Sequence, residues 1–181
     1  MHEHAGHDHD EHDDRLDAAS PDSPVKDAAA PADYSAEDVK VYLCFDPEQL
    51  SCAEKLLEFP VVNHDLTAYV ARAAVPIESP GAEPHKRATR EQLARCNIVL
   101  CVISYLTAQS DWVNWELQTA RDATPRPLFV GVLLHEYDEI PEPMRNAGGM
   151  FTRYRRQNIA AAIDWVMTEK KTTDDYTQWE D

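Results

Sequence analysis

The sequence has no apolar run that approaches the roughly 20 residues needed to span a bilayer. Its first residues, MHEHAGHDHD, lack both the basic region and the apolar stretch of a secretory signal. It also lacks CxxC pairs, and most of its four cysteines (Cys44, Cys52, Cys96 and Cys101) lie in or beside apolar segments. This pattern favours reduced thiols over a disulfide or a metal set. We therefore expect a cytoplasmic protein with no membrane partner.

Nucleotide-binding signatures and basic charge are also missing. The chain contains neither GxGxxG nor GxxxxGK[ST], which excludes the dinucleotide fingerprint and the P-loop. It has 17 Lys and Arg against 33 Asp and Glu, for a net charge of −16. Nucleic-acid binding needs a basic footprint, so we expect no nucleic-acid partner.

Residues 1–38 carry much of the negative charge and few large apolar side chains. Such a composition cannot offset the entropy of ordering, which predicts a disordered acidic tail. Histidines interleave with carboxylates there and could chelate a divalent metal weakly; they are His2, His4, His7, His9 and His12. The alternative is a solvated, pH-sensitive tail or a tag, with only adventitious metal affinity.

Ordered structure is predicted from Val39 onward. VKVYLCF (39–45) has the apolar and β-branched character of a buried strand. Asp46-Pro47-Glu48-Gln49 then has the signals of a helix start, and this helix should reach about Glu58. The residues expected on its inner face are Leu50, Ala53, Leu56 and Leu57.

The segment 61–87 is the least regular in pattern. PVVNHDL suggests a second strand and LTAYVARA a short helical turn. Several prolines and Gly81 then predict a long irregular loop, of the kind that is usually functional or mobile. A capping box at Thr89–Gln92 predicts a short helix that ends near Cys96.

Residues 98–120 hold the strongest signals. IVLCVI (98–103) is apolar at every position, as in a central parallel strand covered on both faces. Ser110 is predicted to cap a helix whose core stripe is Val113, Leu117 and Ala120. Trp112, Glu116 and Thr119 form an adjacent stripe, predicted to turn partly out of the core.

The remaining segments complete an alternating pattern. LFVGVLL (128–134) predicts a strand, the connector 135–148 a helical turn, 149–154 a short edge strand and 157–170 a closing amphipathic helix. We expect an α/β domain over 39–170, flavodoxin-like, with helices on both faces of a parallel sheet of about four or five strands. Residues 171–181 are expected to be a frayed polar tail.

Several side chains are candidates for a ligand site, because open α/β sheets bind ligands beyond the carboxyl ends of their strands. Glu116 is such a candidate, although its helical position alone favours a solvated carboxylate. Trp112 could stack on a nucleotide ring or pack in the core. Asp46 could contact a ligand, but it is also a ready N-cap. Phe45 could contribute an apolar contact.

These motifs resemble a known family. YLCFD (42–46), residues 87–120 with their S-x-W-V-x-W-E string, and LFVGVLL are similar to the TIR-like proteins of bacterial and archaeal antiphage defence, which include the Thoeris TIR-like subunit. Cys44 replaces the Ser usual in the first-strand motif, and Ser104-Tyr105 replaces a glycine-bearing turn.

The resemblance implies a flavodoxin-like TIR fold that cleaves NAD⁺ as substrate, without a further cofactor, and places the catalytic glutamate at Glu116. It also implies an ADP-ribose-type signal that reaches an effector by diffusion, and self-association of the domain. The two departures motivate an alternative: a non-catalytic nucleotide-binding or assembly module of the same fold. A more distant alternative is a deoxyribosyltransferase-like enzyme.

Overall fold

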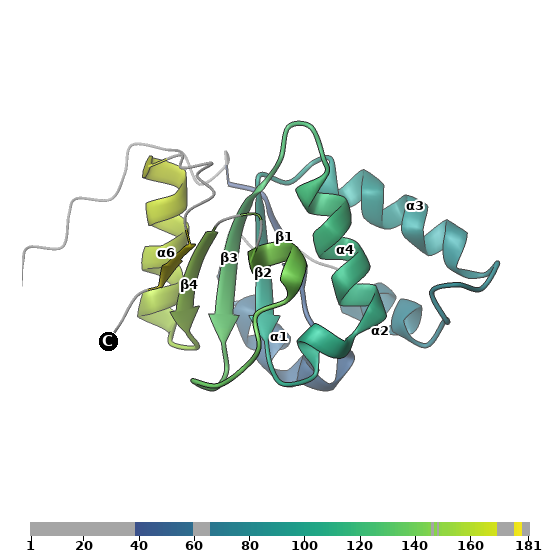
Figure 1. Ribbon diagram of the computed structural model, residues 1–181, viewed down its shortest axis with the longest axis horizontal. Helices are drawn as coiled ribbons and strands as arrows, with labels where there is room; N and C mark the ends of the chain where they lie inside the picture. Colours follow the sequence, from purple (N-terminus) through teal and green to yellow (C-terminus); the bar gives the residue numbers. More distant parts are fainter. Residues whose placement is uncertain (1–38, 60–65, 146, 148, 170–175, 179–181) are drawn as a thin grey trace, which may run out of the picture. The chain divides into compact units, whose positions relative to one another are not determined.

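A parallel β-sheet forms the centre of the domain (Figure 1). The computed structural model describes residues 39–59, 66–145, 147, 149–169 and 176–178. Its strands lie in the order β1-β2-β3-β4-β5 and every neighbouring pair is parallel. The strands are β1 (Val41–Cys44), β2 (Ile98–Ile103), β3 (Leu128–Leu133), β4 (Gly149–Arg153) and β5 (Tyr176–Gln178). The predicted α/β class with a parallel sheet is confirmed.

Helices cover both faces of the sheet (Figure 1). One face carries α1 (Leu50–Leu56) and α6 (Arg156–Glu169), whose neighbourhoods are joined by a Tyr154–Cys52 hydrogen bond of 2.7 Å. The other carries α4 (Asp111–Arg121), which packs against α3 (Ala82–Leu93) and α5 (Glu142–Arg145). Continuous burial of β1 and β2 follows from this double cover.

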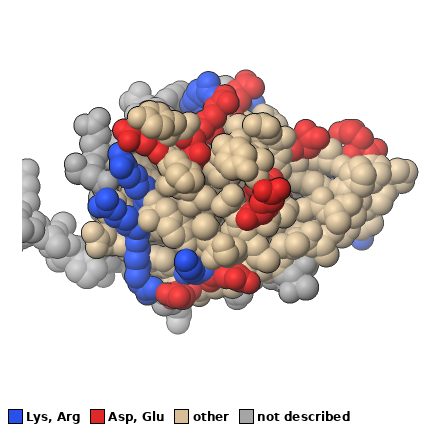
Figure 2. Space-filling model, turned by 90° about the horizontal axis from the view of Figure 1, so that it is seen from below, with Lys and Arg blue, Asp and Glu red and all other residues tan. Residues whose placement is uncertain are grey.

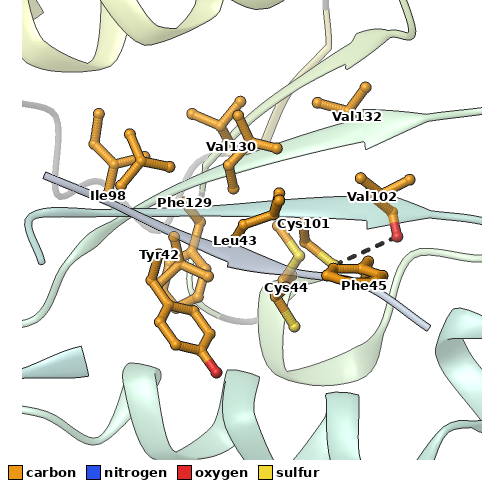
Figure 3. Close-up of a cluster of buried hydrophobic side chains, with 14 of the residues drawn as sticks. Tyr42, Leu43, Cys44, Phe45, Ile98, Cys101, Val102, Phe129, Val130 and Val132 are labelled. Carbon is orange, nitrogen blue, oxygen red and sulfur yellow. Dashed lines mark hydrogen bonds between the residues drawn. The ribbon is translucent and has the colours of Figure 1, made fainter. Parts of the chain in front are cut away.

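Figure 3 shows how β1 contributes to both faces. Leu43 lies between Tyr42 and Cys44, which project to the same side of the strand, as the two-residue repeat of a strand requires. All three side chains are buried. Two polar groups, a phenol and a thiol, are thereby placed beneath the helices on one face of the sheet.

The predicted loop before Thr89 is confirmed only up to Gly81, because residues 74–81 are non-helical and α3 begins at Ala82. Pro84 lies in the first turn of this helix, where the missing N–H would have no intrahelical partner in any case. Thr89 is an interior residue of α3 and 2% exposed, so it caps nothing. LTAYVARA is a full helix, α2 (Leu66–Ala73), rather than a single turn.

Other elements differ in detail from the prediction. The first helix begins as a 3₁₀ turn, Pro47–Gln49, and Leu57 lies beyond α1 and is 38% exposed rather than inward. β4 is not an edge strand, because β5 pairs with it; part of the predicted polar tail is therefore a strand. The predicted strand at 60–66 falls almost wholly outside the described residues.

The remaining predictions of this region agree with the structure. Asp46 caps the 3₁₀ turn by accepting a hydrogen bond of 3.1 Å from the Glu48 amide. The core stripe of α4 and the inner face of α6 are buried as expected. Within the described part of the chain, no helix has the length and apolar character required to cross a membrane.

Candidate functional site

A cleft of about 400 Å³ lies where β1 and β2 end. Its walls are the turn after β1, the segment after α2 and the first turn of α4. Three of its lining residues are acidic (Asp46, Glu48 and Asp111), and no basic residue lines it among those described. Figure 2 views the molecule from the end at which the strands of Figure 1 terminate, and uncharged residues cover much of that face. The position fits the expectation for ligand sites in parallel sheets.

The two predicted residues at this cleft, Asp46 and Trp112, come from different elements. Asp46 lines the cleft and also acts as the N-cap, which confirms the capping interpretation; its contact with a ligand stays a prediction. Trp112 lines it from α4, is 6% exposed, and donates a hydrogen bond of 2.8 Å from Nε1 to the Val75 carbonyl. This bond ties α4 to the segment that follows α2. Trp112 is thus both a packed residue and part of the cleft wall.

Glu116 lies one turn further along α4 than Trp112, and it is 1% exposed. The prediction that this stripe turns partly out of the core is therefore wrong for Trp112 and Glu116, although Thr119 is partly exposed, and the alternative of a solvated carboxylate is wrong. The physical reason is that α2 and α3 cover this side of α4. A carboxylate buried this deeply is costly unless it is paired and hydrogen-bonded.

Both oxygens of Glu116 have partners. Oε2 accepts hydrogen bonds from the Tyr69 hydroxyl at 2.9 Å and the Cys44 thiol at 3.1 Å. Oε1 forms an ion pair with Arg72 Nη2. The Tyr69 hydroxyl also lies 2.8 Å from the Phe45 carbonyl, and since it has one proton it serves the carboxylate or the carbonyl at any moment.

Arg72 is the second centre of this cluster. It is 4% exposed and donates from Nη1 to Thr89 at 2.9 Å and to the Tyr42 hydroxyl at 3.3 Å. Its guanidinium lies 4.0 Å from the centroid of the Tyr69 ring, in a cation–π arrangement. We call the set of Tyr42, Cys44, Tyr69, Arg72, Thr89 and Glu116 the buried polar cluster.

Burial shapes the protonation of this cluster. Desolvation raises the pKa of Glu116 above its ordinary value, although Arg72 and the hydrogen bonds from Cys44 and Tyr69 oppose the shift. Desolvation also raises the pKa of the Cys44 thiol and of the Tyr69 hydroxyl well above their usual ranges. For Arg72, burial lowers the pKa, but the Glu116 carboxylate together with the hydroxyls of Tyr42 and Tyr69 outweighs this effect, so the pKa is raised and the guanidinium keeps its charge.

Phe45 has no exposed surface and stacks on Tyr69, with ring centroids 4.3 Å apart. Its predicted contact with a ligand stays a prediction, and in this arrangement Phe45 supports Tyr69 instead. Cys44 hydrogen-bonds to Glu116, which agrees with a buried thiol rather than a nucleophile. All four cysteines are free.

Sequence reasoning missed the two residues that hold Glu116. Tyr69 and Arg72 are three positions apart in LTAYVARA, and this spacing places them on one helix face. A tyrosine and an arginine on the same side of an otherwise apolar segment were a usable signal. Because only a short helical turn was predicted for residues 66–73, the shared helix face of Tyr69 and Arg72 was not recognised.

The predicted metal ligands, His2, His4, His7, His9 and His12, lie outside the described residues. In the part of the chain that the structure covers, no group of three or more His, Cys, Asp or Glu side chains could hold a metal ion. The tail site therefore stays a prediction.

The parallel sheet, its double helical cover and the S-x-W-V-x-W-E segment on α4 define a TIR-like domain. Residues 46–138, more than half of the chain, match the family described as Thoeris protein ThsB, TIR-like domain. The chain belongs to this family, and the membership supports a role in antiphage defence. No match was found among curated proteins.

Proposed function

We propose that this domain cleaves the nicotinamide–ribose bond of NAD⁺ and releases nicotinamide together with an ADP-ribose-type product. The product would act as a diffusible signal to an effector of antiphage defence, within the cytoplasm where NAD⁺ is available. The observation that carries the proposal is the placement of Glu116. Its carboxylate is desolvated and lies one helical turn after Trp112 on α4. Trp112 lines the cleft at the carboxyl ends of the strands.

Cleavage of the nicotinamide–ribose bond requires one correctly positioned carboxylate from the protein. The C1′–N bond breaks with both electrons going to nicotinamide, which departs neutral and needs no acid catalyst. Positive charge develops on the ribose, as in glycoside hydrolysis. A fixed carboxylate near that charge stabilises the transition state more in a dry site than in water. Water, or a nucleophile of the same molecule in a cyclase, then bonds to C1′ and loses a proton.

The charge of the cleft supports the same substrate. Asp46, Glu48 and Asp111 line the cleft together with the aromatic residue Trp112. Carboxylates and an aromatic ring together attract a cation such as the pyridinium of NAD⁺. This arrangement would place the leaving group at the cleft and the ribose toward Glu116.

The test is nicotinamide release from NAD⁺ by the purified protein, alone and in lysate of phage-infected cells. Glu116→Gln should lower the rate by at least about 10²-fold, the size of effect seen when a group that stabilises transition-state charge is removed. Glu83→Gln on α3 is a matched control, since Glu83 is largely exposed, and its rate should equal that of the wild type. Equal turnover by Glu116→Gln would remove Glu116 from the mechanism.

A second candidate function is a nucleotide-binding or assembly module that does not turn over NAD⁺. The burial of Glu116 and its pairing with Arg72 favour it, because a buried ion pair of this kind can serve the fold alone. Binding of NAD⁺, or self-association measured by light scattering, without nicotinamide release in either setting would support this function. Rapid turnover would exclude it.

A further inference from the structure

Glu116 cannot reach a ribose in the arrangement described. It is 1% exposed, and its oxygens are occupied by Arg72 on one side and by Tyr69 and Cys44 on the other. Catalysis as proposed above therefore requires that at least one oxygen be released. The strongest of these partners is the guanidinium, because it carries a full opposite charge.

Arg72 cannot simply leave Glu116, because a buried cation without a counter-ion is unfavourable. It needs another anion in exchange. The cleft offers the carboxylates of Asp46, Glu48 and Asp111, but Glu48 and Asp111 are exposed to solvent and Asp46 caps the 3₁₀ turn. A substrate that carries an anionic group could supply the counter-ion that Arg72 needs when it separates from Glu116.

The guanidinium is placed to accept such an anion. Its carbon lies 5.0 Å from the ring centroid of Trp112, the residue that walls the cleft. Its Nε has no hydrogen-bond partner among the described residues, so a donor is available. A cavity of about 60 Å³ borders Arg72 together with Tyr69 of α2 and Thr89 of α3. A planar guanidinium also matches phosphate oxygens in pairs.

We propose that Arg72 exchanges partners: it holds Glu116 in the empty enzyme, and a phosphate of the substrate takes Arg72 and frees Glu116 for the ribose. This inference rests on the proposed function and assigns Arg72 as a positioning residue. It makes a phosphate-bearing nicotinamide riboside the substrate class. The phosphate would then raise kcat, and not only affinity, because it unlocks the carboxylate.

The wild-type protein tests this without any variant. Nicotinamide release is measured at saturating NAD⁺, nicotinamide mononucleotide and nicotinamide riboside, which differ in phosphate but share the bond that breaks. We expect kcat for the riboside to be at least about tenfold lower than for the two phosphorylated substrates, the effect of one charged hydrogen bond. Equal kcat values would overturn the exchange and leave the proposed function intact.

Arg72→Lys supplies the second arm, since it keeps the charge but loses the paired geometry of the guanidinium. In this variant, kcat for the riboside should be higher than in the wild type, so that the difference in kcat between NAD⁺ and the riboside becomes smaller. The KM for NAD⁺ should also be higher than in the wild type. A merely structural defect would lower both rates together and would contradict the inference. Arg90→Gln removes an arginine that is half-exposed on α3 and should leave both values unchanged.

Binding of inorganic pyrophosphate, measured by calorimetry, distinguishes a failure of the partner exchange at Arg72 from a failure of the proposed NAD⁺ cleavage. Wild type and Arg90→Gln should bind it alike, and Arg72→Lys about tenfold more weakly. If no substrate releases nicotinamide but pyrophosphate binding depends on Arg72, the proposed function fails and the anion site stands. If pyrophosphate does not bind, or binds independently of Arg72, the exchange is wrong whatever the turnover.

Discussion

At the scale of single residues, Cys44 links the sheet to Glu116 through one hydrogen bond of 3.1 Å. Burial, then its neighbour Cys101 and the carboxylate, raise the pKa of this thiol well above its usual value. A group whose pKa is raised by folding stabilises the protein fully below its unfolded pKa and loses that contribution as pH rises. For cysteine the loss therefore begins near pH 8.5, the approximate unfolded value.

We therefore expect the melting temperature of the wild type to fall as pH rises from about 8 to 10, and that of Cys44→Ser to fall less. Serine keeps a hydrogen-bond donor and does not ionise in this range. Some loss should remain, because burial raises the pKa of Cys96 to about 11. A loss of 1 kcal/mol lowers the melting temperature by about 2–4 °C in a protein of this size, which calorimetry resolves.

Cys52→Ser is the matched control, because Cys52 is only partly buried and lies outside the buried polar cluster. Its melting temperature should follow the wild type across the same range. If the melting temperatures of Cys44→Ser and the wild type decrease equally with rising pH, ionisation of the Cys44 thiol does not contribute to the loss of stability.

Glu116 should set the acid side of the activity profile. Burial raises its pKa, and below that pKa the carboxyl group is neutral and no longer stabilises positive charge on the ribose. The rate of nicotinamide release should therefore fall as pH decreases, with a midpoint above 4.3, the approximate value of an ordinary glutamate. Circular dichroism at each pH checks that the fold persists. A midpoint at or below that value would contradict the raised pKa.

At the scale of secondary structure, the predictions succeeded where a segment's own pattern determines its form. The bounds of β2 at Ile98–Ile103 follow from an apolar run buried on both faces. Helix α4 follows from the buried stripe of Val113, Leu117 and Ala120; Ser110 occupies the N-cap position as predicted, but its side chain makes no capping hydrogen bond. In both, local sequence and tertiary environment favour the same structure.

The failures lie in α2 and α3, where tertiary contacts decide. The prolines and glycine in 76–84 predicted a loop, which is correct as far as Gly81. Helix α3 begins at Ala82, and Pro84 does not prevent it because proline is tolerated in the first turn of a helix. The ion pair between Arg72 and Glu116 spans residues far apart in sequence, and no local pattern reports it. The sequence therefore identified Glu116 as a candidate site residue, but its partners Tyr69 and Arg72 could be identified only from the three-dimensional structure.

Gly131 in β3 offers a test of packing in the sheet. A Cβ at this position would lie 2.6 Å from Phe151 Cε1 and 2.9 Å from Ile103 Cδ1. Both side chains are fully buried and have little freedom to move. Gly131→Ala should therefore lower the free energy of unfolding by about 1–3 kcal/mol, measured by denaturant titration.

Gly81→Ala is the comparison for this prediction. A Cβ there would meet Val75 Cγ1 at 3.5 Å, an ordinary contact, at the start of α3. This variant should change the unfolding free energy by less than about 0.5 kcal/mol, as surface substitutions usually do. A similar cost at both positions would mean that overpacking in the sheet is not the cause.

At the scale of the whole chain, the histidines of the predicted metal site belong to a different part of the sequence from the residues that form the candidate site. The five N-terminal histidines lie in residues 1–38, whereas the cleft and the buried polar cluster are formed by residues from Tyr42 onward. A metal bound by the tail should therefore leave nicotinamide release unchanged. Neutral imidazoles bind Zn²⁺ or Ni²⁺, so metal affinity should fall as pH decreases through about 6.5, the ordinary pKa of histidine.

Calorimetric titration of Ni²⁺ into the full chain and into a chain lacking residues 1–38 tests this separation. Heat of binding should appear only with the full chain, and replacing the five histidines by glutamine should abolish it while retaining the acidic residues. Indistinguishable isotherms for the three proteins would end the idea of a tail site. A loss of nicotinamide release on truncation would instead mean that the tail contributes to the site, because removing a metal-binding appendage alone cannot alter the contacts that hold Glu116.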